Sequence, residues 1–165
     1  MQVRPATRAD LSGILDIYNE AVLNTTASYD YEPRDMAHRV AWFETHAEQR
    51  LPIFVAVDDR GGVAGWSSLS RYHDRRGYQF TVENSVYVAA PLRGQGVGKL
   101  LMPPLIQSAR ELGLRAIIAA IDAENTASIR LHARFGFVEV GHFKQVGFKF
   151  GRWLDVVYME RLLNG

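Results

Sequence analysis

One stretch of the chain reads Val86-Tyr87-Val88-Ala89-Ala90-Pro91-Leu92-Arg93-Gly94-Gln95-Gly96-Val97-Gly98-Lys99. This pattern predicts a strand that leads through a glycine-rich turn into a helix. The first amide hydrogens of a helix are unpaired and lie at the positive end of its dipole, and glycines let backbone nitrogen approach an anion without obstruction. The stretch is therefore typical of a phosphate-binding junction, although a plain connector at a helix start has a similar pattern.

Two nucleotide-binding motifs do not match this junction. A P-loop has four residues between its glycines and a Ser or Thr after its lysine. Here three residues separate Gly94 from Gly98, and Leu100 follows Lys99. The dinucleotide fingerprint Gly-x-Gly-x-x-Gly also fails, because this loop reads Gly-x-Gly-x-Gly and no acidic residue lies near position 118, where the ribose contact is expected.

The residues before and after the junction show two different periods. Apolar and polar residues alternate over residues 80–88, which is typical of a strand with two different faces, and Glu83 and Tyr87 share the polar one. From Val97 the apolar period is helical up to residue 112, and Gly113 is placed to end the helix. Pro103 and Pro104 should distort this helix at a cost of about 3 kcal/mol each.

The rest of the chain predicts an α/β fold. We expect a strand at residues 2–5, a helix after a Thr7–Asp10 capping box, a helix from Pro33 to near Gln49, a hairpin of residues 53–57 and 63–69, a strand at 115–121, a helix at 125–135 and strands at 137–143 and 153–159. The strand at 115–121 should pair parallel with the strand at 80–88, because a β-helix-β crossover favours that arrangement. The remaining pairs should be mostly antiparallel.

Composition limits the protein class. A chain of 165 residues with 47% hydrophobic residues reads as a single domain, residues 1–165, which buries about 70% of its unfolded surface. Nineteen basic against 18 acidic residues give no electrostatic footprint for nucleic acid or a membrane surface. No apolar run approaches the ~20 residues of a membrane helix, and the start of the chain shows no secretory signal, so we expect a cytoplasmic protein.

Arg93-x-x-Gly96-x-Gly98 resembles the pyrophosphate-binding signature of the GCN5-related N-acetyltransferase (GNAT) superfamily. Three further blocks, residues 81–88, 128–132 and 145–155, are similar to its phosphinothricin and methionine-sulfoximine acetyltransferase branch. The resemblance implies the GNAT (acyl-CoA N-acyltransferase) fold, with a mixed, mostly antiparallel sheet flanked by about four helices. It also implies acetyl-coenzyme A as the donor and a homodimer.

The resemblance implies these cofactor contacts. The backbone of Val86, Tyr87 and Val88 would hold the acetyl and pantetheine portion. Arg93, Gly94, Gln95, Gly96, Val97, Gly98 and Lys99 would cradle the pyrophosphate, and Asn125 would contact the cofactor.

Acetyl transfer to nitrogen needs a base, because an amine with a pKa of about 8 or more is mostly protonated at pH 7. Glu83 matches the acidic residue that the resembled branch proposes as general base, and its strand leads directly into the loop. The chain has no cysteine and no Gly-x-Ser-x-Gly elbow, so we expect the acceptor amine to attack the thioester directly. Free backbone amides around Tyr87 or Val88 would donate to the developing oxyanion if the strand splays from its neighbour there. His132 matches a suggested catalytic helper, with a packing histidine as the alternative.

Acceptor recognition is expected just before Glu83, where cations and aromatics alternate over residues 71–80 and a guanidinium can grip a carboxylate. The predicted acceptor-binding residues are His73, Asp74, Arg75, Glu83, Asn84 and Ser85. The chain has Tyr72-His73 where the methionine-sulfoximine enzymes have Trp-Arg, and Asn84 where a histidine is common. Lys149 and Arg152 could line the pocket, and Trp153 is expected in the core.

The leading hypothesis is an N-acetyltransferase for the α-amino group of a small amino-acid-like acceptor of the phosphinothricin, methionine sulfoximine or methionine sulfone type. The alternatives are acetylation of a protein N-terminus or an aminoglycoside, which the cationic 71–76 stretch disfavours, and a non-catalytic acyl-coenzyme A sensor, which Glu83 disfavours. No metal site is predicted, because His38, His46, His73 and His142 lack ligand spacing.

Overall fold

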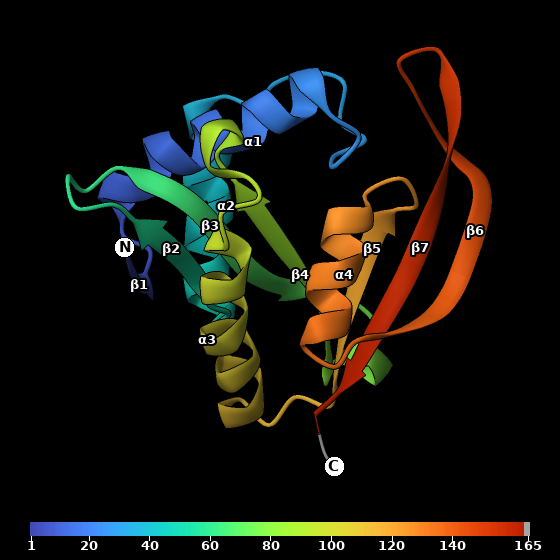
Figure 1. Cartoon of the computed structure of the whole chain (residues 1–165). Helices are drawn as coiled ribbons and strands as arrows, with labels where there is room; N and C mark the ends of the chain where they lie inside the picture. The colour runs from blue at the N-terminus through green and yellow to red at the C-terminus, as the bar shows by residue number, and fades with distance from the viewer. Residues whose placement is uncertain (164–165) are drawn as a thin grey trace.

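The computed structural model describes residues 1–163, and a seven-stranded sheet forms its centre (Figure 1). The strands are β1 (Gln2–Pro5), β2 (Ile53–Val57), β3 (Val63–Arg71), β4 (Thr81–Val88), β5 (Ala116–Asp122), β6 (Val138–Lys149) and β7 (Arg152–Leu162). The α-helices of the described residues are α1 (Leu11–Asn24), α2 (Met36–Gln49), α3 (Val97–Glu111) and α4 (Thr126–Arg134). The strand order is β1-β2-β3-β4-β5-β7-β6, so the predicted mixed α/β architecture is confirmed.

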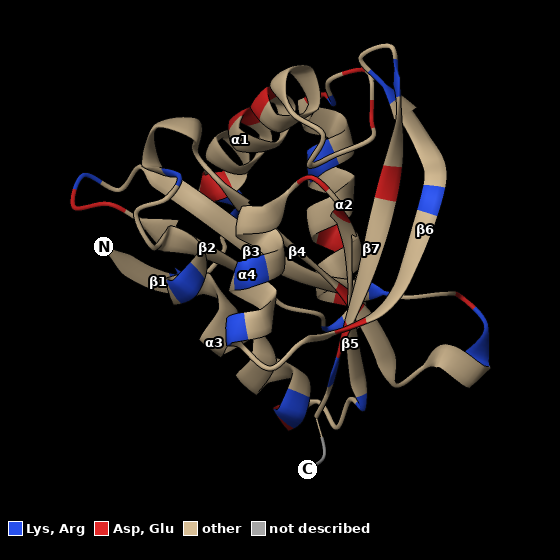
Figure 2. Ribbon diagram, turned by 45° about the vertical axis from the view of Figure 1, so that its right-hand side comes forward, with Lys and Arg blue, Asp and Glu red and all other residues tan. Residues whose placement is uncertain are grey.

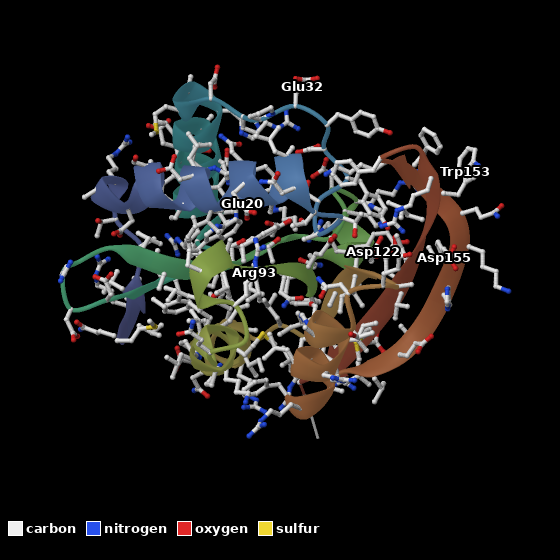
Figure 3. All side chains as sticks on the ribbon, turned by 45° about the horizontal axis from the view of Figure 1, so that its top comes forward. Glu20, Glu32, Arg93, Asp122, Trp153 and Asp155 are labelled. Carbon is white, nitrogen blue, oxygen red and sulfur yellow. The ribbon has the colours of Figure 1, made fainter. Side chains whose placement is uncertain are left out.

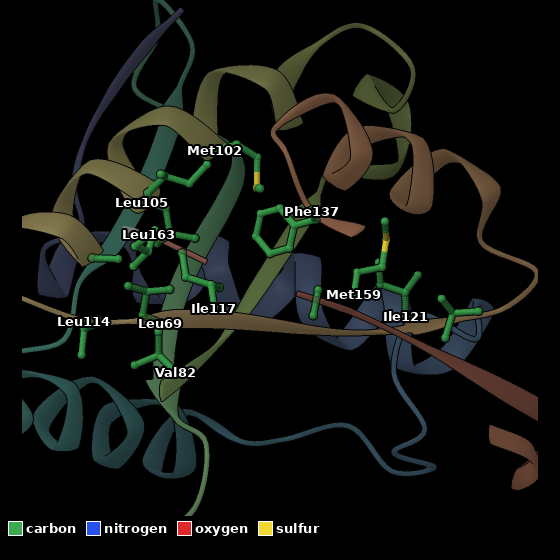
Figure 4. Packing of buried hydrophobic residues seen from close by; sticks show 14 residues of the cluster. Leu69, Val82, Met102, Leu105, Leu114, Ile117, Ile121, Phe137, Met159 and Leu163 are labelled. Carbon is green, nitrogen blue, oxygen red and sulfur yellow. The ribbon is translucent and has the colours of Figure 1, made fainter. Parts of the chain in front are cut away.

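Two apolar layers hold the helices on the sheet. One face packs against α1 and α2 through a cluster that includes Ile14, Val55 and Trp66. The other face packs against α3 and the end of α4 through a larger cluster, in which Met102 and Phe137 lie close to β4 and β5 (Figure 4). The candidate active site lies at the middle of the sheet, between these two layers.

The middle of the sheet divides between β4 and β5. These two strands are the one parallel pair among the described strands, as the crossover rule predicts. They pair only over three residues, Thr81–Glu83 with Ala116–Ile118. Beyond Glu83 the two strands diverge, as Figure 1 shows, while β4 stays paired to β3 and β5 stays paired to β7. We call the opening between residues 84–88 of β4 and the end of β5 the splay.

The predicted ends of α3 and α4 lie within one residue of the observed ones, whereas the start of α2 differs. Its first residue is Met36, and the Asp35 side chain accepts a hydrogen bond from the His38 amide at 2.8 Å. The predicted start at Pro33 is wrong because the aspartate cap, which pairs an unpaired amide, stands two residues further on. Pro33 lies in the connection before the helix.

The prolines of α3 do not interrupt it. The helix is continuous from Val97 to Glu111 with Pro103 and Pro104 inside it, as the apolar period predicts. The carbonyls that these prolines leave unpaired belong to Lys99 and Leu100, which are exposed, so water can hydrogen-bond to them.

The C-terminal hairpin differs most from the prediction. Strand β6 continues to Lys149, six residues beyond the predicted end, and the hairpin projects from one side of the molecule (Figure 1). Trp153 is 64% exposed and points outward in Figure 3, so its predicted place in the core is wrong. An alternating strand pattern shows which residues share a face but does not show which face is covered.

Basic and acidic residues are scattered over the ribbon, as the near-neutral composition predicts (Figure 2). Within residues 1–163, no helix has both the length and the apolarity to cross a membrane.

Candidate active site

The glycine-rich loop presents unpaired backbone amides to solvent. Gly94 and Gly96 have positive φ angles, 76° and 87°, which L side chains rarely adopt, and Gly96 is the N-cap of α3. The amides of Arg93, Gln95 and Lys99 donate to loop carbonyls. Within the described residues, the amides of Gly94, Gly96, Val97 and Gly98 have no backbone acceptor. Free amides at the positive end of a 15-residue helix form a site suited to an anion.

Gly98 and Arg93 fix the loop to its neighbours. A Cβ atom at Gly98 would lie 2.9 Å from Leu131 Cδ2, so the absence of a side chain lets α3 approach α4. Arg93 donates from Nε to the Val88 carbonyl at 3.2 Å and forms an ion pair with Glu20 of α1 (Figure 3). Lys99 is exposed. The loop residues predicted for pyrophosphate therefore surround one helix start.

The splay exposes backbone amides of β4, at one of the two residues expected and at two others. The Ala89 amide donates to Ala64 on the β3 side, whereas the Phe80 carbonyl accepts from Arg115 and Ala116 on the β5 side. Since backbone groups alternate along a strand, the amides of Asn84, Val86 and Val88 face the splay, and the Tyr87 amide faces β3. Val88 therefore faces the splay as expected, together with Val86, whereas Tyr87 does not.

Glu83 is a half-buried carboxylate at the last paired position of β4. Its side chain hydrogen-bonds to none of the described residues, so both oxygens are free to accept a proton. Burial raises the pKa of the Glu83 carboxyl, and the neighbouring His73 opposes this in part. A carboxylate with a raised pKa and free oxygens at the edge of the splay suits a general base.

The predicted acceptor residues divide into two groups. His73, Asp74 and Arg75 line a cavity of about 430 Å³, to which Arg50, Arg71 and Arg76 also contribute. The His73 ring contacts those of Tyr72 and Tyr78 at centroid distances of 4.3 and 5.0 Å. Glu83, Asn84 and Ser85 do not line this cavity. His73 links the two groups, because it lines the cavity and also opposes in part the rise of the Glu83 pKa.

Strand alternation separates Asn84 from its two neighbours. Ser85 shares a face with Glu83 and Tyr87 and lies opposite Ser68 of β3. The Asn84 side chain is on the other face, 7% exposed, where it contacts Met102 of α3 and His132 of α4.

His132 is a buried histidine with both ring nitrogens bonded. Its Nδ1 lies 2.7 Å from the Ser128 carbonyl, and its Nε2 lies 3.0 Å from Asn84 Nδ2. Its ring packs edge-on against Phe137. Burial lowers the pKa of His132, so the ring is neutral near pH 7. This arrangement supports the packing interpretation, since neither nitrogen has a free proton to donate.

Asn125 and Tyr87 have local roles that the structure defines. Asn125 caps α4, and its Oδ1 accepts from the Ser128 amide at 3.1 Å. The Tyr87 ring stacks on Trp66 at 4.9 Å, and its hydroxyl donates to the Ala27 carbonyl at 3.3 Å. Burial raises the pKa of Tyr87, so the phenol keeps its proton.

The connection at residues 25–31 joins α1 to the C-terminal hairpin through contacts that no sequence motif indicated. Tyr29 donates from its hydroxyl to Asp122 at 2.6 Å. Lys149 is 2% exposed and donates to the carbonyls of Val22, Thr25 and Ser28 at 2.6, 2.9 and 2.7 Å, so it does not line a pocket as expected. Asp122 is the carboxylate at the end of the apolar strand β5, and this pattern was the one feature of the sequence that could have indicated the Tyr29 contact.

Known proteins are similar to this chain in sequence and in fold. The Acetyltransferase (GNAT) family model matches residues 14–137. An L-methionine sulfoximine/L-methionine sulfone acetyltransferase of Pseudomonas aeruginosa is 50% identical over 98% of this chain and 94% of its own length. A phosphinothricin N-acetyltransferase of Alcaligenes faecalis is 42% identical over 98% and 82% of the two chains.

A solved structure with acetyl-coenzyme A present is also similar to this chain. It is a GNAT superfamily phosphinothricin acetyltransferase from Sinorhizobium meliloti in complex with acetyl-coenzyme A. It superposes with a TM-score of 0.96 at 40% identity and covers 99% of this chain and 88% of its own. The chain therefore belongs to the GNAT acetyltransferase family and is an acetyl-coenzyme A dependent N-acetyltransferase.

Proposed function

We propose that this chain, as one domain, acetylates the α-amino group of a small amino-acid-like acceptor of the phosphinothricin, methionine sulfoximine or methionine sulfone type, with Glu83 as general base. The acceptor class is supported by the relatives that carry these names at 42% and 50% identity. The observation that carries the base assignment is the half-buried Glu83, whose oxygens are free and whose pKa is raised by burial.

The residues around the splay fit acetyl-coenzyme A, which supplies an activated acetyl thioester when bound. The unpaired amides of the Gly94–Gly98 loop match the needs of a pyrophosphate. The Val86 and Val88 amides, which face the splay, would donate to an acyl oxygen. Asn125, as the cap of α4, and Arg93, which bonds the Val88 carbonyl, complete the proposed cofactor contacts.

Glu83 performs the proton step in this proposal. It accepts a proton from the ammonium form of the acceptor, either directly or through a water, and leaves a neutral amine to attack the thioester carbon. As the N–C bond forms, the C–S bond would break and the thiolate of coenzyme A would leave, and the proton lost by the new amide nitrogen would balance the thiolate, directly or through water.

His73 and Arg75 would hold the acceptor's anionic groups, because both line the arginine-rich cavity. Asp74 lines the same cavity, and its carboxylate would contact a cationic or N–H group of the acceptor instead. We assign Asn84 no acceptor contact, since its side chain lies on the opposite face.

An assay of coenzyme A thiol release tests the proposed function. The acceptors are phosphinothricin, methionine sulfoximine, methionine sulfone, common amino acids, an aminoglycoside and a short peptide. We expect turnover with at least one of the first three, and the absence of cysteine keeps the protein's own thiol background at zero. Turnover with the aminoglycoside or peptide alone would overturn the acceptor class.

We also propose that the chain forms a homodimer through the C-terminal hairpin. β6 is an edge strand of the sheet, and an exposed edge normally needs protection from further pairing. The hairpin exposes an unusual number of large apolar side chains, namely Val138, Val140, Phe143, Val146, Phe148, Phe150 and Trp153. Apolar surface of this extent favours a protein partner, and a second copy is the occupant that we propose.

Trp153→Lys should convert the dimer to a monomer. The substitution places a charge on the most exposed apolar residue of the hairpin, where burial against a second copy would be unfavourable. Light scattering after size exclusion should show the mass halved. Met36→Lys, at an exposed apolar residue of α2, is the control and should leave the mass unchanged. A monomeric unmodified protein would contradict the proposal.

A further inference from the structure

Ala120 is an exposed residue in an otherwise buried strand. It is the one exposed position of β5. Its side chain lies on the same face of the sheet as Glu83, because Glu83 pairs with Ile118 and side chains alternate along a strand. The apolar cluster under α1 and α2 covers this face with residues of β2, β3 and β4, but among the described residues it includes none of β5 or β7. The surface over Ala120 is therefore open, beside the splay.

Tyr158 of β7 borders this open surface. It lies directly opposite Ala120 in the antiparallel pair of β5 and β7, so the two side chains project from the same face. The ring is half-buried and contacts that of Phe143 in β6 at a centroid distance of 4.9 Å. The hydroxyl bonds to none of the described residues and is not one of their buried unpaired atoms, so solvent reaches it.

The Tyr158 hydroxyl is a hydrogen-bond donor near the proposed base. Burial raises the pKa of the Tyr158 phenol, and the nearby Glu83 and Tyr72 raise it further. The phenol therefore keeps its proton near pH 7 and can donate it to a hydrogen bond. Because β5 lies between β4 and β7 in the sheet, Glu83 and Tyr158 stand on the two sides of the surface over Ala120.

An α-amino acid has three groups to place in the proposed reaction. Its amine must reach Glu83, and its carboxylate is proposed to lie against His73 and Arg75, which line the cationic cavity. The side chain then needs a third direction. The open one leads from Glu83 over the small Ala120 to Tyr158.

We propose that Tyr158 is a specificity-determining residue for the acceptor: the acceptor's side chain lies over Ala120, and the Tyr158 hydroxyl donates a hydrogen bond to an oxygen of that side chain. The proposal rests on the proposed function, since it takes Glu83 as the base and an amino-acid-like acceptor. Sulfone, sulfoximine and phosphinate groups carry such an oxygen, whereas the side chain of norleucine does not. Tyr158 thus favours oxygen-bearing side chains over apolar ones of similar length.

Tyr158→Phe keeps the ring and removes the hydroxyl. Loss of one hydrogen bond should lower kcat/KM for methionine sulfone about fivefold to tenfold, mainly through a higher KM, and should leave kcat/KM for norleucine unchanged. Tyr31→Phe is the matched control. It also removes a tyrosine hydroxyl, but this one donates to the Phe148 carbonyl, so the preference between the two acceptors should not change.

Ala120→Leu tests the path of the side chain independently. A larger residue on the open surface should obstruct the acceptor and lower kcat/KM for methionine sulfone at least about tenfold. The dissociation constant of acetyl-coenzyme A, measured by calorimetry, should stay within about twofold of that of the unmodified protein. Ala133→Leu, at an exposed position of α4, is the control and should leave both quantities unchanged.

The outcomes separate this proposal from the proposed function. An equal loss for methionine sulfone and norleucine in Tyr158→Phe would indicate structural damage, and an unchanged KM for methionine sulfone would show that no bond was lost. Either result, or full activity of Ala120→Leu, would overturn the role of Tyr158 and leave the proposed function standing. If the unmodified protein acetylates none of phosphinothricin, methionine sulfoximine and methionine sulfone, the proposed function itself fails.

Discussion

Glu83→Gln should lower kcat at least about 100-fold, because a positioned general base contributes roughly 10² to 10⁴ in rate. The substitution keeps the shape of a half-buried side chain that has no hydrogen-bond partner among the described residues, so folding should be unaffected. The dissociation constant of acetyl-coenzyme A should not change, since the loop and the splay amides are intact. Steady-state kinetics and calorimetry on the same preparation measure both.

Glu139→Gln is the matched control for this experiment. Glu139 is an exposed strand glutamate of β6, and its replacement should leave turnover unchanged. Turnover of Glu83→Gln close to that of the unmodified enzyme would remove Glu83 from the catalytic role. Loss of acetyl-coenzyme A binding in the same variant would instead indicate a structural role.

The pH dependence of kcat/KM should carry the signature of Glu83. The base works only when it is deprotonated, so activity should be low below its pKa and rise with pH through it. Because burial raises this pKa, the rise should lie above the ordinary range for glutamate. This acid limb should be absent from the residual activity of Glu83→Gln. An unchanged limb in that variant would assign it to another group.

Gly96→Asp should weaken acetyl-coenzyme A binding roughly tenfold or more, because a carboxylate beside the unpaired amides repels the phosphates and competes for those donors. The φ angle of 87° also makes any L side chain strained there, whereas nothing lies within 4 Å of the added Cβ. The backbone strain and the charge effect therefore need to be separated.

Gly61→Asp separates them. Gly61 lies in the turn between β2 and β3 with a φ of 83° and open space around its Cβ, so the variant has the same strain away from the loop. It should lose a similar amount of thermal stability and keep its acetyl-coenzyme A affinity. Normal affinity in Gly96→Asp would refute the assignment of the loop to the pyrophosphate.

The sequence by itself determined the elements and much of the loop chemistry. Apolar periods of two and 3.6 residues located the strands and helices, because each period follows from local backbone geometry. The crossover through residues 97–112 predicted the parallel pair for the same local reason. The glycines at 94 and 96 predicted backbone angles that few other residues adopt.

Only the tertiary structure decided which distant groups meet. Asn84 and His132 are 48 residues apart, and Lys149 bonds carbonyls more than 120 residues before it. The length of the β4–β5 pairing sets the splay, and no residue pattern reports where two strands part. The exposure of Trp153 likewise depends on what covers the hairpin. Local periods record how a segment folds, whereas contacts between segments depend on how all the layers pack together.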